Sequence, residues 1–411
     1  MLGAGGARGA DRSVGGVAKL NHPADRTARR LGRAITAQLA LMAAVITLSP
    51  LRFASAPVHG LSFVWGLEDI LLNAVLFLPF GFIPTLTRPR GTPVPWLRVA
   101  LIGFGLSLGI ETAQLFTPER FPSLFDLASN TTGALLGAYF AERLAPRVDG
   151  ADALRGLALE YPLMGIIHLL VPVLWLIGLG SAGPERAWLV LPVVAIAGLI
   201  GGTVFAAERR TEHAPRIRSL AVAGAAWLVV GLLPGSVREW RLIGGAAVIF
   251  VAAAWIGRVL QRRHAIVERR FERVALRRVI PIAIAYLVVS ALHPITLEWV
   301  PLHGTFALFD TASRLSTTEI FRAMERIAAF AAVGYAIAEY RGRREELWTT
   351  LWPRVVFIAA AMALALELAR GLHPIHYASA SLGALSVLAA LFGGWLYRLQ
   401  LDHVRALLGR P

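Results

Sequence analysis

Apolar runs of membrane-spanning length recur along the whole chain, and they restrict the fold more than any other feature. A helix needs about 17–25 residues to cross the hydrocarbon core of a bilayer. Only 16% of the residues are charged and 56% are hydrophobic, whereas about a quarter of the residues in a soluble domain are charged. The sequence therefore predicts an all-α fold, a polytopic transmembrane helical bundle. The twelve predicted spans are residues 34–50, 68–86, 97–117, 124–141, 161–180, 187–207, 218–234, 241–260, 278–294, 322–340, 351–370 and 378–397.

Arginines are concentrated in alternate loops between these runs. Loops on the cytoplasmic side of a membrane protein carry an excess of Lys and Arg. The basic loops predicted on one side are residues 87–98, 142–160, 208–218, 257–278 and 341–354, together with both tails. Both termini are then predicted to be cytoplasmic.

The first and last thirds of the chain share a weak repeat. The sequence "NAVLFLPFGF" (73–82) aligns with "RIAAFAAVGY" (326–335), and "IETAQLFTP" (110–118) aligns with "LELARGLHP" (366–374). Further along, "ASNTTGAL" (128–135) aligns with "ASASLGAL" (378–385). Because each copy has four spans, a parallel duplication is expected.

These patterns divide the chain into six predicted parts. They are a disordered basic tail (1–30), a first four-helix membrane domain (31–145), a middle four-span region (146–260), a basic linker (261–278), a degenerate repeat (279–400) and a cytoplasmic tail (401–411).

Three helices of the first copy each carry a polar pair on one face, because spacings of three or four residues place side chains together. All three pairs lie at helix ends that the predicted topology places outside. They are Asp69 with Asn73, Glu111 with Gln114, and Asp126 with Asn130. Ionisable residues in spans usually face a cavity or pair with one another. We therefore expect an outward-facing polar pocket, with Arg120 of the adjacent loop as counter-charge.

In this pocket Glu111 and Asp126 are the candidate acid and base, and Arg120 would bind an anionic group. The remaining candidate substrate-binding residues are Asp69, Asn73, Gln114 and Asn130. Purely structural roles stay open, as helix caps for the Asp126–Asn130 pair and as an inter-helix hydrogen-bond network for Glu111 and Gln114.

Small and helix-bending residues complete the pattern. Gly133 and Gly137 form a small-xxx-small face of the kind that packs helices closely. Pro79 and Gly81 are expected to bend their span.

The chemistry available to this chain is limited. It has no cysteine, which excludes disulfides and thiolate metal sites. The net charge of +15 lies in loops, so it indicates membrane orientation and no nucleic acid partner. A metal site formed by the three carboxylates is an alternative, but no histidine is present to complete the set of ligands. Neither a metal nor another cofactor is therefore expected. The partner expected from composition is membrane lipid.

The stretches "DILLNAVLFLPFGF" (69–82) and "ETAQLFTPERFPSLFDLASNTTGALLG" (111–137) resemble the VanZ-like family. The resemblance covers residues 34–142, and the second copy follows it only in outline. The resemblance implies an integral membrane protein of the bacterial cell envelope, linked to resistance to the glycopeptide antibiotic teicoplanin. It also implies a location in the bacterial inner membrane and a lipid-linked envelope precursor as partner. Here the turn after Arg120 reads "FPSLF", where family members often carry further acids.

The function expected is therefore binding or processing of an envelope component, such as a lipid-linked glycan or polar lipid, in an outward-facing pocket. Whether catalysis occurs is left open. Two alternatives stand beside it, a non-catalytic membrane scaffold or assembly partner and a proton-coupled transporter. Ligand identity, the oligomeric state and the role of the middle four spans are also left open.

Overall fold

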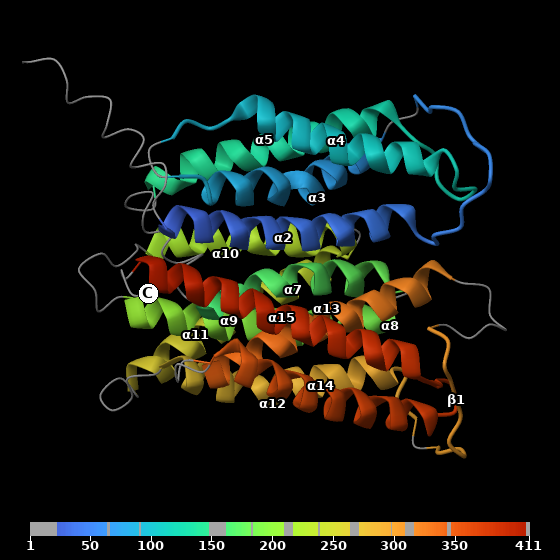
Figure 1. The fold of residues 1–411 in the computed structure, drawn as a ribbon, viewed down its shortest axis with the longest axis vertical. Helices are drawn as coiled ribbons and strands as arrows, with labels where there is room; N and C mark the ends of the chain where they lie inside the picture. Colours follow the sequence, from blue (N-terminus) through green and yellow to red (C-terminus); the bar gives the residue numbers. More distant parts are fainter. Residues whose placement is uncertain are drawn as a thin grey trace, which may run out of the picture.

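The computed structural model describes residues 23–63, 66–89, 92–147, 162–181, 184–208, 217–236, 239–263, 271–296, 298–308, 316–342 and 347–407. In these ranges the chain is an all-α bundle of long helices that run side by side (Figure 1). Its long helices are α2 (Pro23–Leu48), α3 (Leu67–Leu86), α4 (Trp96–Gln114), α5 (Leu124–Arg147), α7 (Pro162–Leu179), α9 (Val190–Glu208), α10 (Ile217–Ser236), α11 (Trp240–Arg263), α12 (Phe271–Leu292), α13 (Thr317–Gly342), α14 (Trp348–Gly371) and α15 (Ala380–Leu407). A short helix, α8 (Pro184–Ala187), precedes α9.

Each of the twelve predicted spans coincides with one long helix. Of the helices that the structure describes, nine are long and apolar enough to cross a membrane. The other three long helices are α5, α10 and α13; α5 and α13 contain several charged residues, and the apolar part of α10 is shorter. The chain is therefore a multi-pass membrane protein.

The predicted N-terminal tail is shorter than expected. Residues 23–30 begin α2, and the prediction of disorder is wrong for them. Ala24 and Ala28 are buried there, and the Thr27 hydroxyl lies 3.0 Å from Nδ1 of His403 on α15. Packing against α15 thus makes residues 23–30 helical, although their arginines are typical of a disordered tail. The rest of that tail, residues 1–22, lies outside the described residues.

Two other predicted boundaries also fall inside helices. Residues 271–278 of the predicted basic linker form the first turns of α12, while residues 264–270 lie outside the described ranges. Residues 401–407 of the predicted C-terminal tail continue α15. Because residues 271–278 contain three arginines and residues 401–407 contain three ionisable residues, composition alone assigns both segments to loops or tails.

Helices of the middle and C-terminal thirds form the centre of the bundle. In Figure 1, α3, α4 and α5 lie on one side, α11, α12 and α14 on the other, and α7, α13 and α15 between them. The indole of Trp175 on α7 is fully buried, and its Nε1 donates to the carbonyl of Val230 on α10 at 2.7 Å. The middle spans, whose role the sequence leaves open, thus join the two outer thirds.

Glycines allow the closest helix contacts. A Cβ added to Gly81 or to Gly137 would overlap a main-chain carbonyl of the facing helix, that of Ala134 or of Leu78. The same arrangement joins α13 to α15, where Gly334 faces the carbonyl of Ala390. Small residues let helix backbones approach closely, which is how helices associate in lipid.

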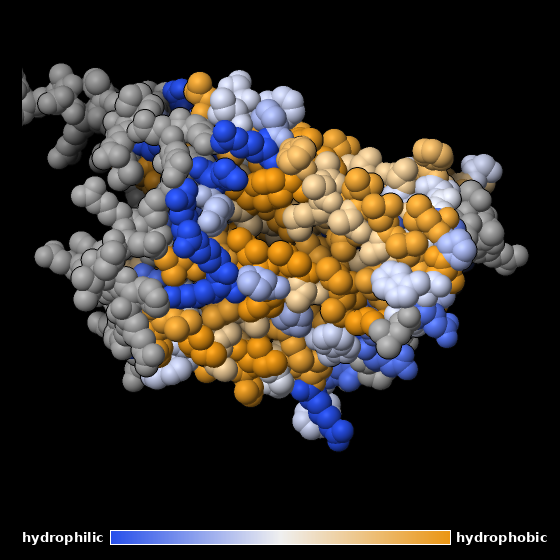
Figure 2. Space-filling model, turned by 90° about the horizontal axis from the view of Figure 1, so that it is seen from below, coloured by the Kyte–Doolittle hydropathy of each residue, from blue (hydrophilic) through white to orange (hydrophobic). Residues whose placement is uncertain are grey.

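The face seen in Figure 2 is hydrophobic across its middle. Strongly hydrophilic residues gather toward its left side, where Figure 1 places the C-terminus. This distribution suits a protein whose sides contact lipid.

At the opposite end of the bundle, loops pair with segments that follow α4 and α14. Ser62 forms an isolated parallel bridge with Ser123. In the C-terminal third, β1 (Gly304–Thr305) pairs in parallel with β2 (Ala378–Ser379). We call this the loop end; all the predicted polar pairs lie toward it.

Candidate functional site

Three carboxylates of the N-terminal third come together at the loop end. Asp126 lies in the first turn of α5, and its carboxylate accepts a hydrogen bond from the Asn73 side chain of α3. Asp126 is close enough to Asp69 and to Glu111 for their charges to interact. The structure therefore brings together residues that three separate helices contribute.

Glu111 is the most buried of these acids, with 5% of its surface exposed. Its Oε2 accepts a hydrogen bond of 2.7 Å from the main-chain N–H of Ser123, in the loop before α5. This bond fixes the carboxylate while leaving its second oxygen for another partner. Asp126 and Asn73 are half-buried, and Asp69 is exposed, so the acids extend from the helix interface to the surface.

The two remaining amides point into the helix interfaces. Nδ2 of Asn130 donates to the Ser107 hydroxyl on α4 at 2.9 Å. Nε2 of Gln114 donates to the carbonyl of Thr47 near the end of α2 at 3.1 Å. The first bond joins α5 to α4, and the second joins α4 to α2. The second is the kind of inter-helix hydrogen bond that the structural alternative predicts for Gln114.

Arg120 does not serve as the predicted counter-charge. Its Nε donates to the carbonyl of Ser49 at 3.0 Å and its Nη2 to that of Ile46 at 3.3 Å. The last carbonyls of a helix have no partner within the helix, so they compete for a nearby guanidinium. Burial lowers the pKa of Arg120, and the neighbouring Glu119 opposes that shift.

In the part of the chain that the structure describes, none of the three carboxylates forms an ion pair with an arginine or lysine. The ion pairs found there involve other acids, such as Glu119, which lies 3.4 Å from Arg52 at the surface. Carboxylates accept hydrogen bonds when ionised and do not donate them. The site is therefore rich in oxygen atoms that can accept hydrogen bonds and, among the residues described, has no facing cation.

The predicted motif residues Pro79, Gly81, Gly133 and Gly137 lie beneath this site, between α3 and α5. A Cβ on Gly133 would overlap the carbonyl of Ala74. Gly81 and Pro79 are buried within α3. These residues set the spacing of the two helices that carry Asp69, Asn73 and Asp126.

Ser107, Ser123 and the carbonyl of Thr47 take part in the site without having been singled out as site residues. Ser107 is fully buried and lies four residues before Glu111 on α4, so helical spacing alone would find it. The other two contribute main-chain groups, for which the sequence has no signal. His59 of the loop before α3 covers the edge, with Nε2 2.9 Å from the carbonyl of Pro118.

The described residues contain no group of three or more His, Cys, Asp or Glu side chains placed to hold a metal ion. The three carboxylates are near one another but do not converge on one point.

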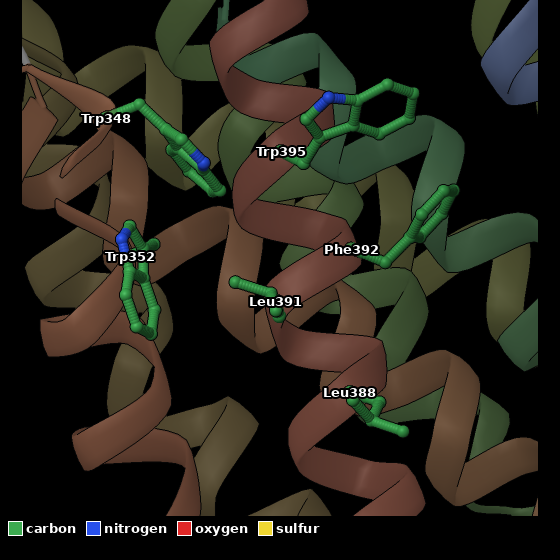
Figure 3. Close-up of a pocket in the computed structure, with 6 residues that line it drawn as sticks. All are labelled: Trp348, Trp352, Leu388, Leu391, Phe392 and Trp395. Carbon is green, nitrogen blue, oxygen red and sulfur yellow. The ribbon is translucent and has the colours of Figure 1, made fainter.

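A surface hollow of about 430 Å³ lies away from the site, on α14 and α15 (Figure 3). Its lining is entirely apolar or aromatic: Trp348, Trp352, Leu388, Leu391, Phe392 and Trp395. Without charged groups, such a hollow suits hydrocarbon rather than a polar headgroup.

One contact of the site recurs in the C-terminal third. Oε2 of Glu367 on α14 accepts a hydrogen bond of 2.6 Å from the main-chain N–H of Ser379. Glu367 is as buried as Glu111, with 7% of its surface exposed. In both places the acid lies near the end of a helix and the donor lies twelve residues later.

Comparison with known proteins finds a match for the N-terminal third of the chain. No curated protein and no solved structure matches the chain. The VanZ/LLP1 family model matches residues 18–145, which include every side chain of the three-carboxylate site. Residues 18–145 are therefore a VanZ/LLP1 family domain, carried by a larger multi-pass membrane protein.

Proposed function

We propose that the VanZ/LLP1 domain binds the polar part of a bacterial envelope component at the loop end, which faces outward from the inner membrane. The observation that carries the proposal is the meeting of Asp69, Glu111 and Asp126, from three helices, at one end of the bundle. Intramembrane acids are costly to place, so a cluster of them indicates function.

The chemistry of the site narrows the ligand class. Three carboxyl groups without a basic partner offer acceptor oxygens and no cation for a phosphate, so they favour groups that donate hydrogen bonds. Arg120, the predicted anion-binding group, is engaged by the carbonyls of Ser49 and Ile46. We therefore favour a headgroup rich in hydroxyls or amines, such as the sugar part of a lipid-linked glycan or a polar lipid.

Should the domain be an enzyme, Glu111 and Asp126 would transfer the protons. Glu111 is held by Ser123 in a buried position, and Asp126 lies nearer the surface. Two carboxyl groups in unlike surroundings are suited to separate acid and base roles. Binding alone requires the same residues, so the first experiment addresses the site and not the reaction.

Complementation in a bacterial host that encodes the chain tests the proposal. The gene is deleted, and glycopeptide sensitivity and the pool of lipid-linked precursor are measured. Wild type, Glu111→Gln, Asp126→Asn and Glu142→Gln are then restored at matched membrane levels. Glu142 lies on the same helix as Asp126, near its other end, and serves as the matched control.

The expected result is rescue by wild type and Glu142→Gln but not by the two site variants. Rescue by all four would overturn the pocket proposal and favour the scaffold alternative. Solute flux in proteoliposomes that Glu111→Gln abolishes would instead favour a proton-coupled transporter.

We infer as well that residues 279–400 are a diverged copy of the N-terminal domain. The inference is supported by the paired contacts Glu111–Ser123 and Glu367–Ser379, by the parallel pairing that each third has at the loop end, and by matching glycine contacts. These contacts match Ser123 with Ser379, so the predicted alignment of residues 128–135 with residues 378–385 is wrong by six positions. The matching glycine contacts are Gly81 with Ala134 and Gly137 with Leu78 in one third, and Gly334 with Ala390 and Gly393 with Ala331 in the other. An experimental structure in which the two sets of four helices do not superpose would contradict it.

A further inference from the structure

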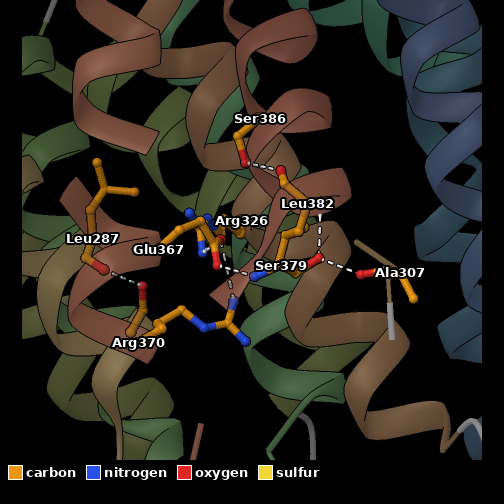
Figure 4. Close-up of polar contacts among 9 residues, drawn as sticks. Leu287, Ala307, Arg326, Glu367, Arg370, Ser379, Leu382 and Ser386 are labelled. Atoms are coloured by element: carbon orange, nitrogen blue, oxygen red, sulfur yellow. Dashed lines mark hydrogen bonds and ion pairs between the residues drawn. The ribbon is translucent and has the colours of Figure 1, made fainter. Parts of the chain in front are cut away.

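A second ionic cluster lies at the loop end of the C-terminal third. Arg326 of α13 meets Glu367 and Arg370, both near the end of α14 (Figure 4). Nη1 of Arg326 is 2.6 Å from Oε1 of Glu367, and Nη1 of Arg370 is 3.8 Å from the same oxygen. One carboxylate is therefore shared by two guanidinium groups.

The cluster has an excess of positive charge. Glu367 supplies a single negative charge, and its other oxygen, Oε2, is occupied by the N–H of Ser379 at 2.6 Å. Two arginines beside one glutamate leave a net charge of one positive unit. Burying a charge that is not fully paired costs free energy. A bound anion would pair with the surplus positive charge and reduce that cost.

The donors that would hold such an anion are buried and unused. Only 8% of the Arg326 side chain is exposed. Within the described residues its Nε and Nη2 have no hydrogen-bond partner, and neither has Nε of Arg370. Because a guanidinium presents its N–H groups as a planar fork, it matches the oxygens of a phosphoryl group.

Neighbouring charges do not cancel the surplus. Glu325 is occupied elsewhere, at 2.7 Å from Arg186 and 2.7 Å from the hydroxyl of Tyr286. Burial, followed by the charges of Arg370 and His373, lowers the pKa of His376 to about 4. His376 is therefore neutral at pH 7 and adds no charge that could cancel the surplus.

The N-terminal domain differs at the matching position. Arg370 lies three residues after Glu367, as Gln114 lies three residues after Glu111. Gln114 is a neutral amide that donates to the carbonyl of Thr47. The chain thus places a cation where its own VanZ/LLP1 domain has none, which supplies a natural substitution for a test.

We propose that Arg326 and Arg370 form an anion site that binds a phosphoryl group. The ligand enters past Arg370, whose side chain is 15% exposed, and receives hydrogen bonds from Nε and Nη2 of Arg326. Its source is either free phosphate or the headgroup of a phospholipid. This site is independent of the function proposed for residues 18–145.

The test uses the full chain purified in detergent, titrated with inorganic phosphate by calorimetry at constant ionic strength. Wild type is expected to bind phosphate saturably and to unfold at a higher temperature when it is bound. Arg370→Gln and Arg326→Asn are expected to weaken binding by about tenfold or more, the effect of losing a charge-assisted hydrogen bond. Arg52→Gln, at an exposed loop-end arginine, is the control and leaves binding unchanged.

A second arm identifies the source of the phosphoryl group. Native mass spectrometry compares lipid retained from phosphatidylglycerol vesicles with lipid retained from uncharged galactolipid vesicles. Selective retention of phosphatidylglycerol, lost in Arg370→Gln, supports a headgroup site, and phosphate binding alone supports a free-anion site.

Two results would overturn the proposal. One is wild-type protein that neither binds phosphate saturably nor prefers phosphatidylglycerol. The other is equal binding by wild type and both site variants. If those variants do not fold, Arg326→Lys replaces them. Lysine keeps the positive charge but lacks the planar guanidinium group, so phosphate binding is expected to be weaker than in wild type. The wild-type measurements do not depend on any variant.

Discussion

The main-chain N–H of Ser123 lies 2.7 Å from Oε2 of Glu111. This bond ties the loop before α5 to the end of α4 and sets the position of the most buried acid in the VanZ/LLP1 domain. Its two partners respond differently to substitution, because several residues can replace the Glu111 carboxylate whereas only proline would remove the N–H group of residue 123.

Glu111→Ala is expected to lower the free energy of unfolding by about 1–3 kcal/mol, since it leaves the N–H of Ser123 buried without an acceptor. Glu111→Gln retains an acceptor oxygen and is expected to lose less stability. Thermal unfolding of the purified variants in detergent measures the difference. Equal destabilisation by the two variants would show that the hydrogen bond is not the stabilising element.

Gly137→Ala is expected to destabilise the bundle by about 1–3 kcal/mol, the usual effect of overpacking. The added methyl group would overlap the carbonyl of Leu78 on α3. Gly109→Ala is the matched control, because nothing lies within 4 Å of a Cβ at that position of α4. Alanine is a better helix former than glycine, so the control is expected to be neutral or slightly stabilising in the same unfolding assay.

Arg120→Gln is expected to cost about 1–3 kcal/mol, because it removes charged donors from the carbonyls of Ser49 and Ile46 at the end of α2. Arg52→Gln removes an exposed ion pair with Glu119, and such pairs contribute about 0–1 kcal/mol. Comparison of their unfolding temperatures distinguishes the two. If Arg120→Gln left stability unchanged while abolishing ligand binding, the original anion-binding role of Arg120 would be restored.

Arg370→Gln is expected to raise the pKa of His376 from about 4 toward 6.5, because it removes a positive charge that disfavours protonation. Since the pKa of His376 is lower in the folded state, its neutral form adds stability that is present above pH 6.5. That stability is lost as the pH falls from about 6.5 to about 4. NMR titration of isotope-labelled histidine measures the pKa, with His376→Gln to assign the signal, and an unchanged pKa would exclude Arg370 as a cause.

Glu325→Gln is expected to destabilise the fold by about 3–5 kcal/mol, since it leaves Arg186 buried without its partner. Both side chains are almost fully buried, at 4% and 2% exposure. The double variant Arg186→Met/Glu325→Leu is expected to recover most of the loss, because apolar residues need no counter-charge. A double variant that is as unstable as the single one would point to Tyr286 as the partner that matters.

The sequence predicts the helices well because hydrophobic length is a local property. It does not predict the starts of α2 and α12, where arginine-rich turns become helical by packing against other helices, as Thr27 does against His403. Nor does the sequence predict that α7 lies at the centre of the bundle, because a helix that contacts lipid and a helix that contacts protein can have the same apolar composition.

The sequence predicts the part of the candidate site that depends on helical spacing and topology. Helical spacing places Asp126 and Asn130 on one face of α5, and topology brings Asp69 and Glu111 to the same end. Spacing cannot say what Arg120 binds, because carboxylates and helix-terminal carbonyls attract a guanidinium alike. Nor can it reveal Ser123, which contributes its main chain to the bond with Glu111.

The burial of α7 has a consequence for how the protein is made. Synthesis proceeds from the N-terminus, so α7 is inserted before α13 and α15, the helices that later cover it, have left the ribosome. Its sequence is among the most hydrophobic of the nine candidate spans, which allows it to remain in lipid until they arrive. The face of α7 that meets Tyr335 of α13, whose hydroxyl donates to the carbonyl of Pro162, must then exchange acyl chains for protein neighbours late in biogenesis. A chain truncated before α13 would leave that face exposed to lipid.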